Sequence, residues 1–402
     1  MGKKKPIKLN DQQLMLDASR VADIYHQMTI DLFDQVVDRV RERGTASLEE
    51  NPYIWQLEKM SEMGLLNKDN IKLIAEYSGV AEEQLRYVIE NEGYKVYKDT
   101  KSQLLEALGG NGDFITNNLI QTNLANYVNQ TTGDIDNLIN TTLPKSVRKV
   151  YQGIVEETVA KVITGLATPE KAISSTVIKW AEKGFYGFTD KGGKQWRADT
   201  YARTVINSTS WRVYREARMA PAKELGIDTF YYSMKPAARE MCAPIQHQIV
   251  TFGETRVEEG EKIYSLLDYG YGSAGGCLGI NCHHTLTPYV VGVNYKPDLP
   301  EHLTNLTPEK AIENANKQSK QRAIERSIRQ SKEMLHIANK LEDEELINKY
   351  KGQVKSRQAA MRAYLSQNPF LHRDYSRERY YSDPLREAKA EIKLRKDRKM
   401  VI

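Results

Sequence analysis

The feature that most constrains the fold is an apolar repeat near the start of the chain. Apolar residues recur there at steps of three, four or seven, which places them on one side of an α-helix. The residues of this stripe are Leu14, Val21, Ile24, Met28, Leu32, Val36 and Val40. The stripe predicts one long helix that ends near Gly44.

Helices are predicted through the rest of the N-terminal part of the chain. Glycine near the end of an apolar repeat favours a helix C-terminus, so breaks are expected near Gly64 and at Ser78-Gly79, between short helices. Residues 111–142 are rich in Asn and Thr but keep helical apolar spacing, so this helix should depend on tertiary contacts. A loop or short hairpin over 184–193 marks the end of a helical N-terminal region, residues 1–190.

The next region changes character. A long helix over Arg197–Arg218 is followed by a Gly-containing turn and the β-rich run Thr229–Met234, which is the start of a small α+β unit over 195–297. After two prolines, Thr307-Pro308-Glu309 signals a new helix, and helices continue through a C-terminal region, residues 305–402. The fold class is therefore mainly α, with extended helical N- and C-terminal regions that flank a small α+β module containing cysteine and histidine.

Charge limits the possible partners. The chain has 58 basic and 53 acidic residues, so its net charge of +5 is weak evidence for nucleic acid. The final segment mixes Arg and Lys with Tyr375, Tyr380 and Tyr381, a combination that can follow a nucleic-acid backbone. Acidic residues interrupt this segment throughout, which is more typical of a solvated or protein-docking helix. The longest apolar runs are too short to cross a bilayer, so no membrane span is expected.

The residues with the most chemistry lie close together in the sequence. All three cysteines, and three of the seven histidines, lie between Cys242 and His284. Three cysteines are too few for a disulfide framework in a chain of this size, which points to a reducing compartment or a metal. A structural Zn²⁺ takes about four Cys or His ligands, so the predicted ligands are Cys242, Cys277, Cys282 and His284, with His247 or His283 as substitutes. The alternative is a set of free, partly buried thiols.

Two enzymatic interpretations of the same segment are weaker. Cys282 with a neighbouring histidine could form a nucleophile pair, but no third residue that would orient the base is identifiable. Gly270-Tyr271-Gly272-Ser273-Ala274-Gly275 has the spacing of a dinucleotide-binding loop, yet it leads into another Gly pair and Cys277, where such a loop would open a helix. These glycines are better explained as a tight turn around the Cys/His cluster.

An ordered series of short segments resembles the phage minor capsid protein 2 family, which is related to the phage Mu F-like head-morphogenesis proteins. The segments are Met241–Gln246, Tyr269–Gly272, Gly279–His284 and Pro288–Val293, together with Ala202–Thr204 upstream and Gln318–Lys332 downstream. The resemblance covers residues 195–335. Members often carry a Cys at the position of Arg239 and a Gly at that of His247, so Cys277 or His247 is expected to replace one ligand.

The resemblance implies a minor head protein, and not an enzyme, that acts near the portal in procapsid assembly or genome delivery. The partners it implies are the portal protein, the major capsid or scaffold protein and other copies of the chain. Its expected location is the virion, in the capsid interior or at the portal vertex, and the host cytoplasm during assembly. A protein bound to the end of the packaged genomic DNA is the alternative, and a Cys- or metal-dependent enzyme is a weaker one.

Overall fold

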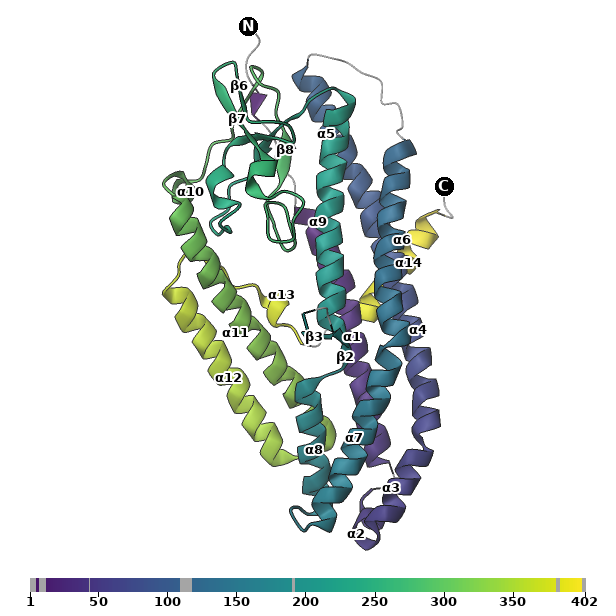
Figure 1. Cartoon of the computed structure of the whole chain (residues 1–402). Coiled ribbons are helices and arrows are strands. Elements are labelled where there is room, and N and C mark those ends of the chain that lie inside the picture. Colours follow the sequence, from purple (N-terminus) through teal and green to yellow (C-terminus); the bar gives the residue numbers. More distant parts are fainter. Residues whose placement is uncertain are drawn as a thin grey trace. The chain divides into compact units, whose positions relative to one another are not determined.

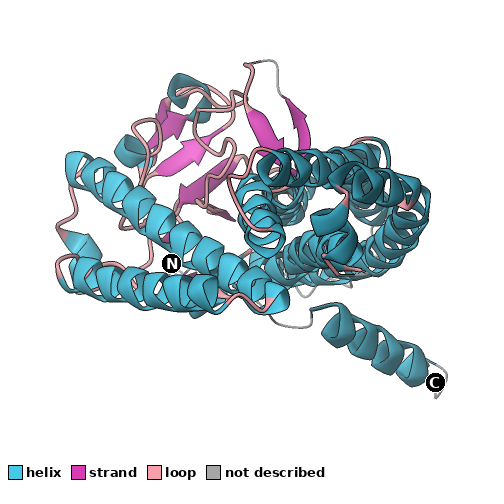
Figure 2. Ribbon diagram, turned by 90° about the horizontal axis from the view of Figure 1, so that it is seen from below, coloured by secondary structure: helices cyan, strands magenta, loops and turns pink. Residues whose placement is uncertain are grey.

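A computed structural model describes residues 5–6, 12–42, 44–108, 118–189, 192–380 and 384–399 (Figure 1). The fold is mainly helical with a small mixed sheet, as the sequence predicts (Figure 2). The helices are α1 (Gln12–Arg41), α2 (Ala46–Glu50), α3 (Pro52–Ser61), α4 (Met63–Tyr87), α5 (Gly93–Ala107), α6 (Asn118–Thr141), α7 (Leu143–Ile163), α8 (Pro169–Lys183), α9 (Ala198–Glu224), α10 (Glu301–Thr304), α11 (Pro308–Leu341), α12 (Glu344–Ser366), α13 (Tyr375–Glu378) and α14 (Pro384–Lys399).

The chain forms two compact units, each assembled from separate segments. The module unit comprises Met1–Ser19, Leu85–Thr131 and Thr204–Lys320, and the bundle unit comprises Arg20–Gln84, Thr132–Arg203 and Gln321–Ile402. The boundaries between these segments fall within helices α1, α4, α6, α9 and α11. The division into 1–190, 195–297 and 305–402 stays a prediction for proteolysis or truncation to test.

Helix α1 follows the predicted stripe. All of its members from Val21 to Val40 are buried, whereas the side chain of Leu14 lies outside the described residues. The helix ends at Arg41, where buried Lys59 donates from Nζ to the carbonyl oxygens of Arg39 and Glu42 at 2.9 and 2.6 Å. A cation at these carbonyls satisfies acceptors that have no partner within the helix.

The predicted break at Ser78-Gly79 is wrong. Helix α4 runs without interruption through Gly79, and a π-helical turn, Val88–Glu92, joins it to α5. Glycine inside a helix costs only about 1 kcal/mol relative to alanine, which tertiary packing overcomes. The break expected near Gly64 is real and falls at Glu62, between α3 and α4.

The Asn- and Thr-rich segment is helical from Asn118, whereas residues 111–117 lie outside the described part. Leu124, Val128 and Ile135 are buried as their spacing predicts. Leu119 is exposed, and its neighbour Ile120 is buried in its place.

A hairpin does begin within the predicted range 184–193 but extends beyond it, since β2 (Tyr186–Thr189) pairs with β3 (Gln195–Arg197). Helix α9 follows directly and is longer than predicted, because it continues beyond Arg218 to Glu224. Helix α11 starts at Pro308, as the Thr-Pro-Glu signal predicts. Among the described helices, none combines the length and apolarity needed to cross a membrane.

The module unit contains a five-stranded sheet in the order β6-β7-β5-β4-β8. Its strands are β4 (Thr229–Tyr232), β5 (Ile249–Thr251), β6 (Arg256–Glu258), β7 (Glu261–Ser265) and β8 (Leu286–Pro288). Strand β5 runs parallel to β7, and the other neighbours are antiparallel. A separate short pair joins β1 (Lys5–Pro6) to β9 (Asn294–Tyr295).

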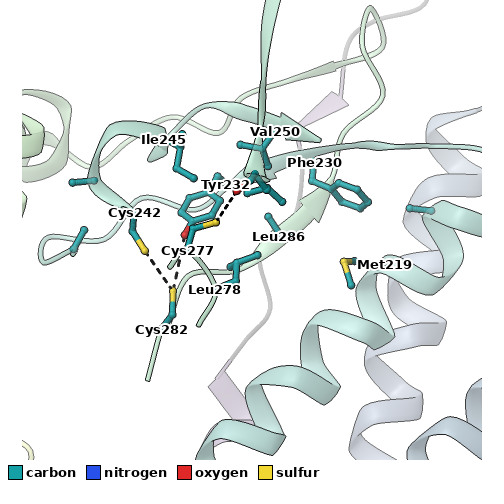
Figure 3. Close-up of a cluster of buried hydrophobic side chains, with 14 of the residues drawn as sticks. Met219, Phe230, Tyr232, Cys242, Ile245, Val250, Cys277, Leu278, Cys282 and Leu286 are labelled. Carbon is teal, nitrogen blue, oxygen red and sulfur yellow. Dashed lines mark hydrogen bonds between the residues drawn. The ribbon is translucent and has the colours of Figure 1, made fainter. Parts of the chain in front are cut away.

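Strand β4 is buried on both faces, and its side chains alternate between two cores. Phe230 and Tyr232 enter the larger core with Val250 and Leu286, while Tyr231 enters a smaller one with Ile249 and other residues. The period of two along a strand produces this alternation. All three cysteines belong to the larger core, so the candidate site is part of the packed interior (Figure 3).

Candidate metal centre

Two short connections bring the candidate ligands together. Cys242 lies just before a single 3₁₀ turn, Ala243–Ile245, in the connection from β4 to β5. Cys282 and His284 lie in the loop that leads into β8. Because β4 pairs with both β5 and β8, these two connections are held beside each other.

Three ligand atoms lie close together. The Sγ atoms of Cys242 and Cys282 are 3.8 Å apart, and Cys282 Sγ is 3.4 Å from His284 Nδ1. All three atoms lie within 4.8 Å of one another. Bond lengths of about 2.3 Å for Zn–S and 2.0–2.1 Å for Zn–N give tetrahedral edges of about 3.8 Å between sulfurs and about 3.5 Å between sulfur and nitrogen. The Cys242–Cys282 and Cys282–His284 separations therefore match two edges of a zinc-sized tetrahedron.

Gln246 and Tyr232 hold the ring of His284 in place. Gln246 Oε1 accepts hydrogen bonds from His284 Nε2 at 2.8 Å and from the backbone N–H of Lys235 at 2.7 Å. A carbonyl oxygen can only accept, so Nε2 carries a proton, and Nδ1 is the ring nitrogen that faces Cys282. The Tyr232 ring packs on His284 at 4.9 Å between centroids, and its hydroxyl lies 4.0 Å from Cys282 Sγ. Histidines that bind metals are commonly fixed in this way.

The two neighbouring thiols have pKa values that shift in opposite directions. A hydrogen bond from Cys242 lowers the pKa of Cys282, burial opposes the shift, and His284 lowers it further. The same hydrogen bond and burial raise the pKa of Cys242 well above its ordinary value. Cys282 is therefore held as the thiolate, the form that binds metals.

The fourth predicted ligand does not join this group. Cys277 is buried in the same core, but its Sγ donates to the carbonyl oxygen of Leu266 at 3.4 Å, and burial raises the pKa of its thiol to about 12. The proposed substitutes also face elsewhere. His247 hydrogen-bonds the Tyr231 hydroxyl through Nδ1 at 3.0 Å, and His283 stacks on Trp211 at 5.2 Å between ring centroids.

The glycine-rich loop makes the turn that the sequence suggests. A Cβ atom added at Gly276 would lie 1.8 Å from the carbonyl oxygen of Gly270, so only glycine permits the backbone to approach this closely. The crossing places Cys277 in the core and leads directly to Cys282. The loop is thus part of the cluster's framework and not a phosphate-binding loop.

Sequence reasoning missed three residues around the cluster. In the sequence, Gln246 ends one of the family segments and Tyr232 belongs to a predicted strand, and nothing there assigns either to His284. Arg215 on α9 is half-buried. Burial lowers the pKa of its guanidinium, and the charge of Cys282 opposes this shift. Among the described residues, its Nη1 atom has no hydrogen-bond partner. Helical spacing alone could not have shown that Arg215 faces the cluster.

The three candidate ligands are shielded from solvent. Cys242, Cys282 and His284 have exposed fractions of 1%, 4% and 4%. Zinc sites that hold a fold together are closed, whereas catalytic sites keep a position open to water or substrate. Burial fits a closed site, but a structural zinc takes four ligands, and three come together among the described residues.

Comparisons with known proteins define the class of protein. The chain is 32% identical over 370 residues to a "Structural protein" of Lactococcus phage LL-H. The aligned region covers 89% of this chain and 98% of that relative. The chain is 36% identical over 118 residues to a "Structural protein" of Lactococcus phage mv4, covering 29% of this chain and 92% of that relative. No solved structure matches.

A family model gives the finer identification. The model described as "Phage minor capsid protein 2" matches residues 9–366, so the chain belongs to that family and is a phage structural protein. The match confirms the resemblance based on residues 195–335. It also extends the resemblance into the N-terminal half, where the sequence showed only helical character.

Proposed function

We propose that this chain is a non-catalytic head protein that acts near the portal, in procapsid assembly or genome delivery. The observation that carries the proposal is the family match over residues 9–366. The portal protein, the major capsid or scaffold protein and other copies of the chain are its proposed partners. The capsid interior or the portal vertex is its proposed location in the virion.

Zinc held by Cys242, Cys282 and His284 is the second part of this proposal. It is supported by the close approach of the three ligand atoms, two of whose separations match tetrahedral edges, and by the hydrogen bond from His284 to Gln246. Bound Zn²⁺ would add its binding free energy to the folding of the module. The ion would join the connection after β4 to the loop before β8.

A role in binding other virion proteins fits the chain better than a catalytic role. The cluster is buried from solvent, and both relatives are named as structural proteins. Long helices such as α4, α7, α11 and α12 offer extended surfaces to neighbours. Virion proteins that work by contact need such surfaces more than they need a cleft.

The structure favours the contact function over the genome-binding alternative. Several basic side chains of α14 have partners within the bundle unit. Lys389 pairs with Glu76, Lys396 pairs with Glu83 at 3.0 Å, and Arg395 donates to Gln84 Oε1 at 2.7 Å. Lysine and arginine side chains that are already paired gain less binding free energy from phosphate contacts, because each must first give up its partner within the protein. We therefore expect weak duplex DNA binding.

Cross-linking inside purified procapsids tests the proposal. A lysine-reactive cross-linker followed by mass spectrometry should join this chain to the portal protein more often than to the major capsid protein, after correction for copy number. Cross-links spread evenly over the major capsid protein would refute the portal assignment. Salt-sensitive, stoichiometric binding to duplex DNA would favour the genome-binding alternative.

A further inference from the structure

Five large apolar side chains are exposed at one end of the bundle unit. We call this set the apolar tip, and its members are Tyr53, Ile54 and Leu57 on α3, Ile163 at the end of α7, and Leu166 in the turn to α8. Leu57 and Leu166 have exposed fractions of 71% and 78%. On the other side of α3, Trp55 is only 1% exposed, so this short helix carries apolar residues on two faces.

The two parts of the tip lie at the same end of the unit. Helix α3 packs against α7, where the Tyr151 hydroxyl donates to the carbonyl oxygen of Lys59 at 3.0 Å. Thr45 Oγ1, just before α2, donates to Glu170 Oε1 in the first turn of α8 at 2.8 Å. Figure 1 shows α2, α3 and the connection from α7 to α8 together at one end of the bundle.

Spacing makes the α3 residues one surface. Tyr53 and Leu57 are four residues apart and Ile54 and Leu57 are three apart, so all three project from the same side of the helix. Single exposed apolar residues are common on soluble proteins, but a group of them usually marks a surface that another molecule covers. The buried contacts of α3 use its Trp55 face, so the fold does not require the Leu57 face to be apolar.

The charges around the tip are mainly acidic, and the two lysines that flank its second part, Lys161 and Lys171, form ion pairs with Glu157 and Glu345. Glu49 and Glu50 on α2, Glu58 on α3 and Glu170 on α8 flank the apolar residues. The stretches 44–58 and 163–170 contain no lysine or arginine, although the whole chain has a net charge of +5. The tip is thus an apolar surface with an acidic border.

We propose that the apolar tip docks another virion protein, on a surface with an apolar centre bordered by lysine and arginine. This inference rests on the proposed function, which supplies a virion partner. Opposite charge at the border attracts and orients the partner, while burial of the apolar residues supplies most of the affinity. A second copy of the chain is disfavoured as the occupant, because two acidic borders would repel each other.

The test uses head particles assembled without this chain, to which purified full-length protein is added. The double variant Leu57→Ser/Leu166→Ser should bind about tenfold more weakly or worse, as expected when central apolar contacts of an interface are lost. Leu119→Ser/Leu394→Ser is the matched control, since these leucines are 67% and 58% exposed elsewhere. Glu49→Gln/Glu50→Gln should weaken binding at low salt and reduce its salt dependence.

Each outcome decides something. Normal binding by the tip variant, with binding by the wild type intact, would overturn the docking site and leave the proposed function standing. Failure of the wild type to bind the particles at any salt concentration would overturn both. A dimer in light scattering that the tip variant disperses would show that a second copy occupies the tip, which would also overturn the proposal.

Discussion

Replacing Gln246 with leucine tests the cluster more sharply than removing a ligand, because every candidate ligand remains in place. Gln246 Oε1 accepts from the buried His284 Nε2–H and from the backbone N–H of Lys235. Leucine keeps the bulk and accepts neither bond. A fully buried donor without a partner costs about 1–3 kcal/mol, and the half-buried Lys235 donor costs less. We therefore expect a loss of about 2–4 kcal/mol in the free energy of unfolding of the module unit.

Metal affinity should fall as well. Loss of a residue that hydrogen-bonds a metal-binding histidine typically weakens metal binding by about 10- to 100-fold, or about 1.4–2.8 kcal/mol. Urea unfolding followed by near-UV circular dichroism measures the stability, and competition with a zinc chelator measures the affinity. The half-buried neighbour Gln248→Leu is the matched control and should change stability by less than about 0.5 kcal/mol. Equal behaviour of the two variants would refute the role of Gln246 in holding His284.

Other predictions concern both units. Cys282→Ser, or removal of metal by a chelator, should increase hydrogen exchange over residues 230–295 while α11 and α12 stay protected. Cys277→Ser should retain the metal. Loss of metal from both cysteine variants alike would contradict the three-atom site. Burial raises the pKa of Asp199, but Arg197 and His26 outweigh it and hold the pKa well below 3.8. This carboxylate therefore stabilises the bundle unit above about pH 4, and the contribution is lost as the pH falls further; acid unfolding should be less steep in Asp199→Asn, and an unchanged profile would count against the ion pair. Gly153→Ala should destabilise by about 1–3 kcal/mol in thermal unfolding, since the new Cβ would lie 2.3 Å from Trp180 Cζ2. Gly79→Ala, in open space, should stabilise by about 0.5–1 kcal/mol, and a reversed order of these two variants would show that the helix packing is wrong.

Periodicity predicted the helices well and their ends poorly. The stripe from Val21 to Val40 is buried as expected, because a repeat sustained over several turns has few alternative explanations. The break at Ser78-Gly79 was wrong because one glycine costs little in a helix that packing supports. The order of the five short strands was beyond prediction, since strands of three to five residues carry too little pattern to specify their partners.

The candidate site was predictable in composition but not in geometry. The density of cysteine and histidine between Cys242 and His284 identified the region, and the structure gathers Cys242, Cys282 and His284 there. It leaves Cys277 bonded to the Leu266 carbonyl, because the crossing at Gly270 and Gly276 sets the direction of that loop. Neither this crossing nor the support from Gln246 has a sequence pattern, since both depend on contacts between distant segments.

The central claim is that the chain works by contact at one vertex of the phage head. Cryo-electron microscopy of procapsids carrying a bulky tag on this chain, reconstructed without imposed icosahedral symmetry, measures this directly. The account predicts additional density at the portal vertex and none at the other eleven positions of the icosahedral shell. Tag density at every vertex, or scattered through the shell, would contradict it.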